Sequence, residues 1–193
     1  AFCQGLVLGG VLDGITVTDA RFTGGTFDFL SPFAIACGFG LICGYALLGS
    51  TWLMMRLEGT VGTKARTWAF PALILMLVFI VAVSVWTPLI DPHISERWFS
   101  RPNIYVLWLV PIATALLALL AMRNIDAGRG FPAFAASVGL FLLCFLGLGI
   151  STFPYLVPPT LTVWDTAAVP ASQLFTLAGV LVMLPIILFY TAF

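Results

Sequence analysis

Few residues in this sequence could bind a metal or move a proton, and those few are scattered. The single histidine, His93, follows Asp91 and Pro92 in a short polar segment between two long apolar runs. A haem held between helices usually needs a His, Met or Cys ligand at the depth of the bundle, whereas His93 is expected in a loop. The chain has no GxSxG, Walker A or HExxH motif and no cluster of Cys and His. We therefore predict no catalytic residue, no metal ligand and no haem ligand in it.

The sulfur-containing residues are expected to pack and not to react. Four cysteines lie in apolar stretches, and no two of them form a CxxC pair. Small buried hydrophobic residues are the simplest interpretation, ahead of a disulfide or a metal site. The five methionines are interpreted in the same way, as packing or lipid-facing residues. The cysteines are Cys3, Cys37, Cys43 and Cys144.

Composition identifies the class of protein that must position these residues. Of the 193 residues, 61% are hydrophobic and 8% are charged, and the mean hydropathy is +1.11. A soluble domain carries roughly 25% charged residues, so eight basic and eight acidic side chains are too few to solvate a globule of this size. With a net charge of zero, the chain also shows no excess of basic residues that would bind a nucleic acid. The chain is therefore predicted to be a polytopic membrane protein, with no nucleic-acid partner.

Five apolar runs predict five full transmembrane helices. Each run has 19 to 24 residues and lacks Asp, Glu, Lys, Arg and His. At about 1.5 Å per residue, even the shortest run reaches roughly the hydrocarbon thickness of a bilayer, and the runs lack the alternation of barrel strands. A sixth apolar stretch, Phe2–Leu12, is too short for a full span. The expected fold class is an all-α membrane protein, a polytopic transmembrane helix bundle with five full transmembrane helices plus one partial. The five runs are Pro32–Met55, Trp68–Ile90, Ile104–Met122, Phe131–Phe153 and Ser172–Phe193.

Proline and glycine positions give further expectations about these helices. Pro71 and Pro132 sit in the expected first turns, where a missing N–H costs nothing. Pro111 and Pro185 lie inside runs and should kink their helices. Two GxxxG pairs are typical of positions where helices approach closely; they are Gly5 with Gly9, and Gly40 with Gly44.

Basic residues in the connections predict the orientation. Alternate connections lie on the same side of a membrane, and the cytoplasmic side carries more Lys and Arg. The second and fourth connections, Arg56–Thr67 and Arg123–Gly130, hold five basic residues, and the other three connections together hold three. The second and fourth connections are therefore predicted to be cytoplasmic, and Pro154–Ala171 is predicted to lie outside.

Four residues in the connections are candidates for structural or partner contacts: Glu58, Tyr155, Trp164 and Asp165. Glu58 follows Arg56, with which it could pair. The other three lie in Pro154–Asp165, an apolar stretch with three prolines and one charge. A loop exposed to water would be more polar, so this stretch is expected to pack on another subunit or to re-enter the membrane interface. Because its prolines restrict the backbone, it can hold a defined shape even without regular hydrogen bonds.

Asp165 carries the most specific of these expectations. A carboxylate beside Trp164 at the membrane boundary cannot sit bare in lipid. It should accept hydrogen bonds from nearby backbone N–H groups and cap a short helical turn. The loop would then brace the outer end of the last helix, whose predicted run begins at Ser172.

The same region carries the most specific resemblance to a known family. Residues 153–172, FPYLVPPTLTVWDTAAVPAS, followed by LPIILFYTAF, resemble the C-terminal end of subunit II of cytochrome bd-type quinol oxidases. Gln4-Gly5 with Gly9-Gly10 is similar to the family's QGxxLGG stretch, and Ser31-Pro32-Phe33 is similar to its SPF helix. Arg56-Leu57-Glu58-Gly59 stands where many members have Lys-Thr-Glu-Gly; the basic charge and the Glu-Gly are kept. The resemblance covers essentially the whole chain.

The resemblance implies a place in a larger enzyme. Subunit II of the family has eight transmembrane helices, so residues 1–193 would form a single transmembrane domain, the end of helix three and helices four to eight, truncated at both ends. The partner, subunit I, would hold two b haems, one d haem and the quinol site. The complex would oxidise quinol and reduce O₂ to water in the cytoplasmic (inner) membrane of a bacterium or archaeon. This chain would be a supporting subunit that binds no haem, in contact with lipid and in some members with a structural quinone.

Two other classes of protein stay open at this point. A fragment of a secondary transporter would also be a polytopic bundle, but transporters show broken helices with polar groups near mid-membrane, and these runs are free of charge. An assembly scaffold without a redox function is the other alternative. Purification together with a haem-bearing partner would separate it from an oxidase subunit.

Overall fold

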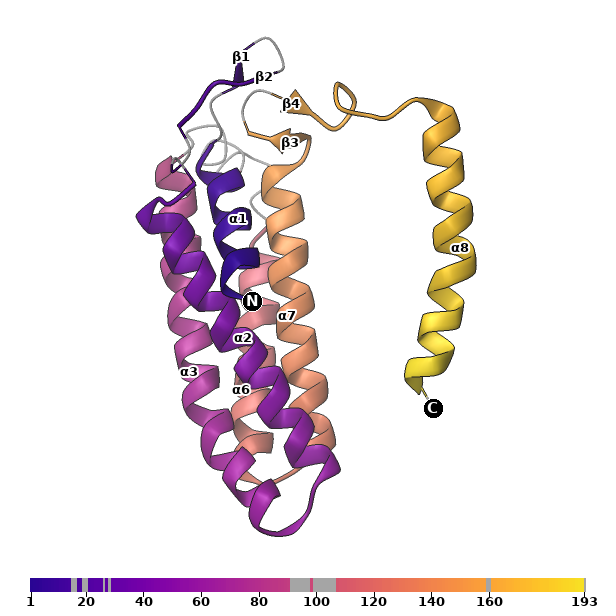
Figure 1. The fold of residues 1–193 in the computed structure, drawn as a ribbon. Helices are drawn as coiled ribbons and strands as arrows, with labels where there is room; N and C mark the ends of the chain where they lie inside the picture. Colours follow the sequence, from indigo (N-terminus) through magenta and orange to yellow (C-terminus); the bar gives the residue numbers. More distant parts are fainter. Residues whose placement is uncertain are drawn as a thin grey trace.

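The computed structural model describes residues 1–14, 17–18, 21–25, 27, 29–90, 98, 107–158 and 161–192. Five of the helices in this part of the chain are long and apolar enough to cross a membrane, and one is shorter. This confirms the predicted class, an all-α polytopic membrane protein. Successive long helices run antiparallel (Figure 1). In chain order the described helices are the short α1 (Phe2–Asp13) and the long α2 (Pro32–Arg56), α3 (Gly59–Ile90), α6 (Leu109–Asp126), α7 (Gly130–Thr152) and α8 (Pro170–Ala192).

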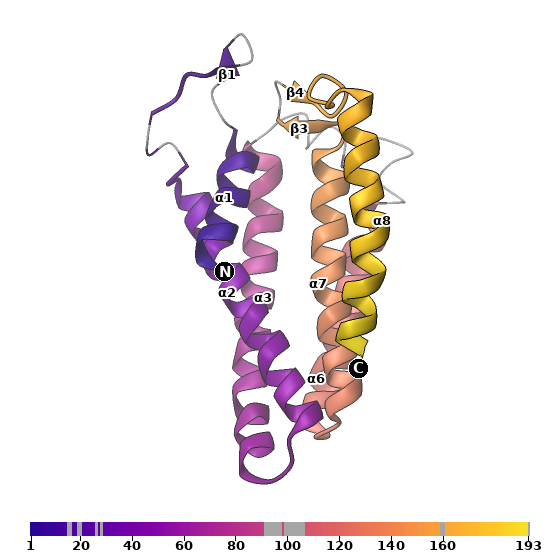
Figure 2. The same ribbon diagram turned by 45° about the vertical axis from the view of Figure 1, so that its right-hand side comes forward.

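Four of these helices, α2, α3, α6 and α7, form a bundle with a common core (Figures 1 and 2). The core is built largely from small side chains, because van der Waals contact between close backbones, and not water exclusion, drives helix association in lipid. Six of its eleven buried members are alanines. They are Ala69, Ala72, Ala118, Ala121, Ala133 and Ala136, and the larger members are Leu47, Leu73, Met76, Ile125 and Leu140.

The short helix α1 lies against α2 through the first GxxxG pair. A Cβ added to Gly5 would stand 2.6 Å from the Cys37 carbonyl oxygen, and one added to Gly9 would stand 2.5 Å from the Ala34 Cα. Only glycine allows this approach, so the expected close contact is confirmed for this pair. Gly40 and Gly44 instead face aromatic side chains, those of Phe79 and Phe141.

Helix α2 begins where its sequence provides a cap. The Ser31 hydroxyl accepts a hydrogen bond from the Ala34 N–H at 3.1 Å, and Pro32 occupies the first turn, where no N–H is required. The helix ends at Arg56, and only Leu57 and Glu58 separate it from α3.

The prediction that Arg56–Thr67 is a loop is therefore wrong. Helix α3 begins at Gly59, which has φ +75°, and the segment that follows it is helical. The Thr63 hydroxyl donates to the Gly59 carbonyl at 3.0 Å, one turn earlier. Hydropathy marks the part of a helix that lies in lipid, and these first turns are polar, so the helix extends beyond the apolar run.

The observed starts of α3 and α6 change the positions of two prolines within their helices. Pro71 lies in the interior of α3 and not in a first turn. Pro111 lies in the first turn of α6 and not in its interior, because α6 begins at Leu109 and the expected start at Ile104 lies outside the described residues. Pro132, in the first turn of α7, and Pro185, inside α8, are placed as predicted.

Two short antiparallel pairs of strands lie at one end of the bundle (Figure 1). Strand β1 (Val17–Thr18) pairs with β2 (Arg21–Phe22), and β3 (Tyr155–Val157) pairs with β4 (Leu161–Thr162). We call this the hairpin end. The opposite end, where α2 meets α3 and α6 meets α7, is called the basic end, since it carries Arg56, Lys64, Arg66, Arg123 and Arg129.

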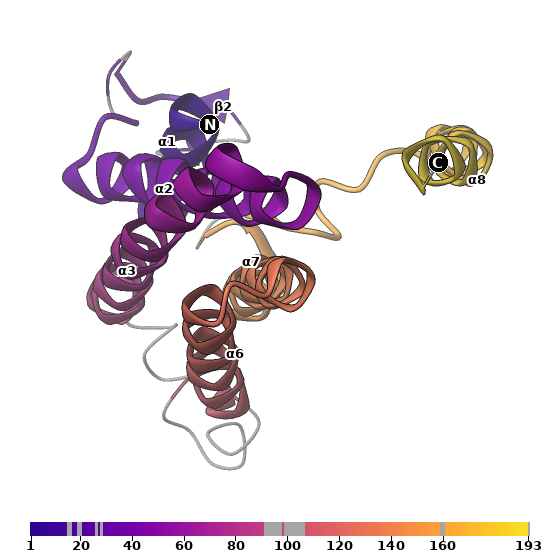
Figure 3. The ribbon, with the colours of Figure 1, turned by 90° about the horizontal axis from the view of Figure 1, so that it is seen from below.

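Helix α8 stands apart from the other helices (Figures 1 and 3). Each of its residues whose side chain is described is exposed, whereas 22 to 33% of the most apolar window of every other long helix is buried inside the chain. Residues 167–169, which belong to no helix or strand, precede α8 on the side of the β3–β4 hairpin.

Candidate partner-contact site

The predicted loop after α7 is a hydrogen-bonded hairpin. Tyr155 pairs with Thr162 and Val157 with Leu161, with an irregular register between them. The Val163 N–H donates to the Pro154 carbonyl at 2.9 Å, just beyond the cis Phe153–Pro154 peptide bond. The segment therefore has a defined shape, as predicted, and regular backbone hydrogen bonds help to hold it.

Asp165 accepts a backbone hydrogen bond, as predicted, and the donor is Thr162. The Thr162 N–H lies 3.1 Å from Asp165 Oδ2, the Thr162 hydroxyl donates to the same oxygen at 2.5 Å, and the Asp165 N–H lies 3.3 Å from Thr162 Oγ1. This reciprocal arrangement is that of a capping box. The Thr166 N–H, 3.3 Å from the Thr162 carbonyl, closes the turn that the box caps.

The same two bonds set the protonation of Asp165. Donation by the Thr162 hydroxyl, and then by the Thr162 N–H, holds the pKa of the Asp165 carboxyl below its ordinary value of 3.8. Both donors favour the charged form. Asp165 is therefore a carboxylate at physiological pH.

Trp164 attaches the hairpin to the end of α7. Its ring meets the Phe153 ring edge-on, with centroids 5.6 Å apart and an angle of 70°. Trp164 nevertheless remains 66% exposed. The contact is with α7, so the prediction that this loop braces the last helix is wrong for the described contacts. Although Trp164 is close in sequence to α8, its aromatic partner, Phe153, lies at the end of α7, the preceding helix.

The start of α8 is held by its own connecting residues. The Gln173 side-chain amide donates to the Ala168 carbonyl at 2.7 Å, and the Ser172 N–H donates to the Val169 carbonyl at 2.9 Å. These local bonds satisfy groups at the helix start, and neither involves Asp165.

Three of the four candidate residues are thus brought together, and one is not. Tyr155 is half-buried, and its strand partner Thr162 also binds Asp165, next to Trp164. Glu58 lies at the opposite end, exposed in the two-residue turn between α2 and α3. Thr162 and Phe153 were missed as members of the hairpin site. The spacing Thr-x-x-Asp, a capping-box pattern, was the signal that could have identified Thr162.

The pairing with Glu58 that the sequence allowed for Arg56 is not formed. The Arg56 guanidinium lies over the Trp52 ring, 4.8 Å from its centroid, a cation–π contact. Trp52 in turn meets Phe134 of α7 edge-on, with centroids 5.2 Å apart. The end of α2 is therefore tied to the start of α7 by a stack of three side chains.

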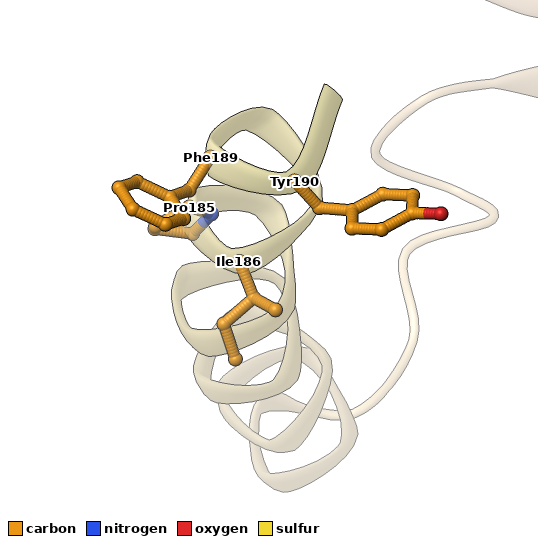
Figure 4. Close-up of a pocket in the computed structure, with 4 residues that line it drawn as sticks. All are labelled: Pro185, Ile186, Phe189 and Tyr190. Atoms are coloured by element: carbon orange, nitrogen blue, oxygen red, sulfur yellow. The ribbon is translucent and has the colours of Figure 1, made fainter. Parts of the chain in front are cut away.

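A shallow apolar hollow lies on α8 near its end (Figure 4). It is lined by Pro185, Ile186, Phe189 and Tyr190, with Tyr190 pointing to one side of the helix and Phe189 to the other. No charged side chain lines it, so it offers apolar contact and one phenolic hydroxyl. This chemistry suits packing against a lipid or another helix.

No metal centre is built from the residues that the structure describes. They contain no group of three or more His, Cys, Asp and Glu side chains close enough to hold an ion. His93 lies outside the described residues. All four cysteines are free, and Cys3 is exposed while the other three are partly buried, so full burial was not found.

Comparison with known proteins bears on the classes that the sequence left open. The family model for cytochrome bd terminal oxidase subunit II matches residues 1–193, the whole chain. The chain belongs to this family. Membership in the cytochrome bd family does not favour the transporter alternative, and it confirms the resemblance seen in the sequence.

Curated relatives agree with the family assignment. The chain is similar to cytochrome bd-I ubiquinol oxidase subunit 2 of Escherichia coli K12, with 28% identity over 97% of the chain. It is also similar to a probable cytochrome oxidase subunit 2 of Haemophilus influenzae, with 25% identity over 99% of the chain. In both cases the match covers 59% of the relative, so the chain spans about three-fifths of the length of these subunits.

Proposed function

We propose that this chain is a supporting subunit, without haem, of a bd-type terminal oxidase that oxidises quinol and reduces O₂ to water. The match of the subunit II family over all 193 residues carries the proposal. In the reaction, two quinols release four electrons and four protons and become two quinones, while O₂ takes up four electrons and four protons to give two waters.

The chain's part in that reaction is to complete the membrane complex. The apolar runs of its long helices contain no Asp, Glu, Lys, Arg or His, which supports a role in packing and not in proton transfer at mid-membrane. Two b haems and one d haem would lie in subunit I. The chain itself would be non-catalytic, a single transmembrane domain corresponding to the end of helix three and helices four to eight. A structural quinone is a further possible ligand of the subunit.

The hairpin site would meet the partner subunit or the membrane interface. Trp164, Leu156 and Val163 leave 66%, 55% and 44% of their surface exposed beside the capped turn. Exposed apolar side chains on a rigid backbone suit a partner surface, since little entropy is lost when they are covered. The complex would be located in the bacterial inner membrane, with the basic end in the cytoplasm.

Co-purification with a haem protein tests the proposal. The full-length subunit, tagged and expressed in its native host, should purify with a larger partner that shows b- and d-haem absorption bands. The complex should consume O₂ with a quinol as electron donor. His93→Ala should leave the haem bands unchanged, because no haem ligand is assigned to this chain. Purification of the folded subunit with no haem-bearing partner would instead support the scaffold alternative.

A further inference from the structure

Gln4 is a polar side chain on an otherwise apolar helix. Apart from Gln4 and the terminal Asp13, helix α1 contains only apolar residues and glycine. The Gln4 side chain is exposed, and it forms no hydrogen bond within the described part of the chain. Its amide carries N–H donors and a carbonyl acceptor, so groups outside this part of the chain must satisfy them.

The contact between α1 and α2 shows how deep Gln4 lies. Gly5, the next residue, lies against the backbone of Cys37. Cys37 is five residues into α2, which begins at Pro32 near the hairpin end. At about 1.5 Å per residue, Gln4 therefore lies roughly 8 Å inside the start of that span. The N-terminus accordingly lies beside the bundle, away from both of its ends (Figure 1).

This depth keeps Gln4 away from water. Asp13, whose charge belongs at the membrane boundary, is nine residues further along α1, which is roughly 13 Å of helix. Lys and Arg side chains can extend from within the membrane to the headgroups, but the Gln side chain is shorter. Lipid tails offer no hydrogen-bond partner, so an amide left bare among them is unfavourable. A polar partner must therefore lie within the membrane.

The side of α1 that carries Gln4 is open. Gln4, Val7 and Val11 are three and four residues apart, so they lie on one face of the helix. Val7 is 61% exposed, whereas Gly5 and Gly9 lie on the opposite side, against α2. Among the described helices only α2 shares a broad contact with α1, and α1 lies on the outer side of α2 (Figure 3).

We propose that a further transmembrane helix packs on this open face and hydrogen-bonds the Gln4 amide through a polar side chain of its own. Amide side chains that bond across helices hold transmembrane helices together. The helix would be one that precedes α1 in the full-length subunit, because consecutive elements are usually neighbours in space. The curated relatives have length for it, since the match covers 59% of each. The inference rests on the proposed place of the chain within subunit II.

Replacing the amide by an apolar group of similar length tests the hydrogen bond. In the purified complex with the full-length subunit, Gln4→Met should lower the melting temperature by a few degrees, because the polar partner loses its bond. Val7→Met is the matched control on the same face, and it should melt close to wild type. An unchanged or higher melting temperature for Gln4→Met would overturn the proposal, since that is the result expected for an amide that faces lipid alone.

Photo-crosslinking identifies the partner. With p-benzoylphenylalanine in place of Gln4, irradiation of the native membrane should link position 4 to a segment of the same subunit that precedes α1, as read by mass spectrometry of the digested complex. A crosslink to subunit I, or only to lipid or quinone, would overturn the assignment. The haem bands of the same preparation test the proposed function separately: a crosslink within the subunit, in a preparation without haem, would contradict the oxidase assignment and support the helix contact.

Discussion

Thr162 and Asp165 each bind the backbone of the other, with the Thr162 N–H 3.1 Å from Asp165 Oδ2 and the Asp165 N–H 3.3 Å from Thr162 Oγ1. The pair closes the turn that follows β4 and holds Trp164 between its two members. Trp164 in turn meets Phe153 at the end of α7. The geometry of the apolar hairpin therefore depends on one threonine and one aspartate.

Removing either partner of this pair should loosen the hairpin. Asp165→Ala and Thr162→Ala are each expected to lower the melting temperature of the complex, because each leaves a backbone N–H without its side-chain acceptor. The double variant should be little worse than the poorer single variant, since both break the same unit. Thermal unfolding of the purified complex measures this.

Turnover of the complex is the control for these melting experiments. Turnover per haem should stay near the wild-type value in all three variants, because the pair is structural. A normally assembled Asp165→Ala complex whose quinol oxidation had collapsed would show that Asp165 is functional, contrary to this interpretation.

The lowered pKa of Asp165 predicts how its contribution depends on pH. A carboxyl whose pKa is lower in the folded than in the unfolded state stabilises the fold above its unfolded value, about 3.9, and loses this effect as the pH falls through the folded value. Asp165→Asn keeps an oxygen acceptor without the charge. The difference in melting temperature between wild type and Asp165→Asn should be largest near neutral pH, should begin to fall near about pH 4, and should be lost only as the pH falls through the lower folded pKa.

Because Asp165 is exposed, the pH effect should be small and sensitive to salt. Melting curves from about pH 7 to about pH 3, at low and high ionic strength, measure it. A wild-type advantage that grew toward low pH would show that the folded state prefers the protonated acid.

The contact between α1 and α2 should tolerate no side chain at Gly9. A Cβ there would stand 2.5 Å from the Ala34 Cα, so Gly9→Val must push the helices apart, at a cost of about 1–3 kcal/mol, as for other overpacked sites. Gly49→Ala is the matched control, because nothing lies within 4 Å of its added Cβ. Yield and melting temperature of the complex should fall for the first and stay close to wild type for the second.

The orientation predicted from the basic residues can be tested by labelling single cysteines. On a background without the four native cysteines, Glu58→Cys should react with a membrane-impermeant reagent only after the cytoplasmic side is opened. Val163→Cys, 44% exposed in the wild type, should react from outside in intact cells. The reverse pattern would invert the topology and move the basic end to the outer face.

Much of the architecture follows from local properties of the sequence. Whether twenty residues can cross a membrane depends on their own hydropathy, so the five long helices could be predicted within a few residues over their lipid-embedded parts. The capped turn is local too, since Thr162 and Asp165 are three residues apart. The start of α3 at Gly59 escaped prediction for a related reason: its first turns are polar, and hydropathy does not report a helix that continues into water.

Contacts between distant residues were decided by the tertiary structure alone. Both GxxxG pairs look alike in sequence, yet Gly5 and Gly9 meet a backbone while Gly40 and Gly44 meet aromatic rings. Arg66 donates to the carbonyl of Asp126, sixty residues away. Such contacts depend on where all the helices lie at once, because a partner is chosen by position and free surface as well as by residue type. The same reason explains why the hairpin rests on α7, through Phe153, and not on the helix that follows it.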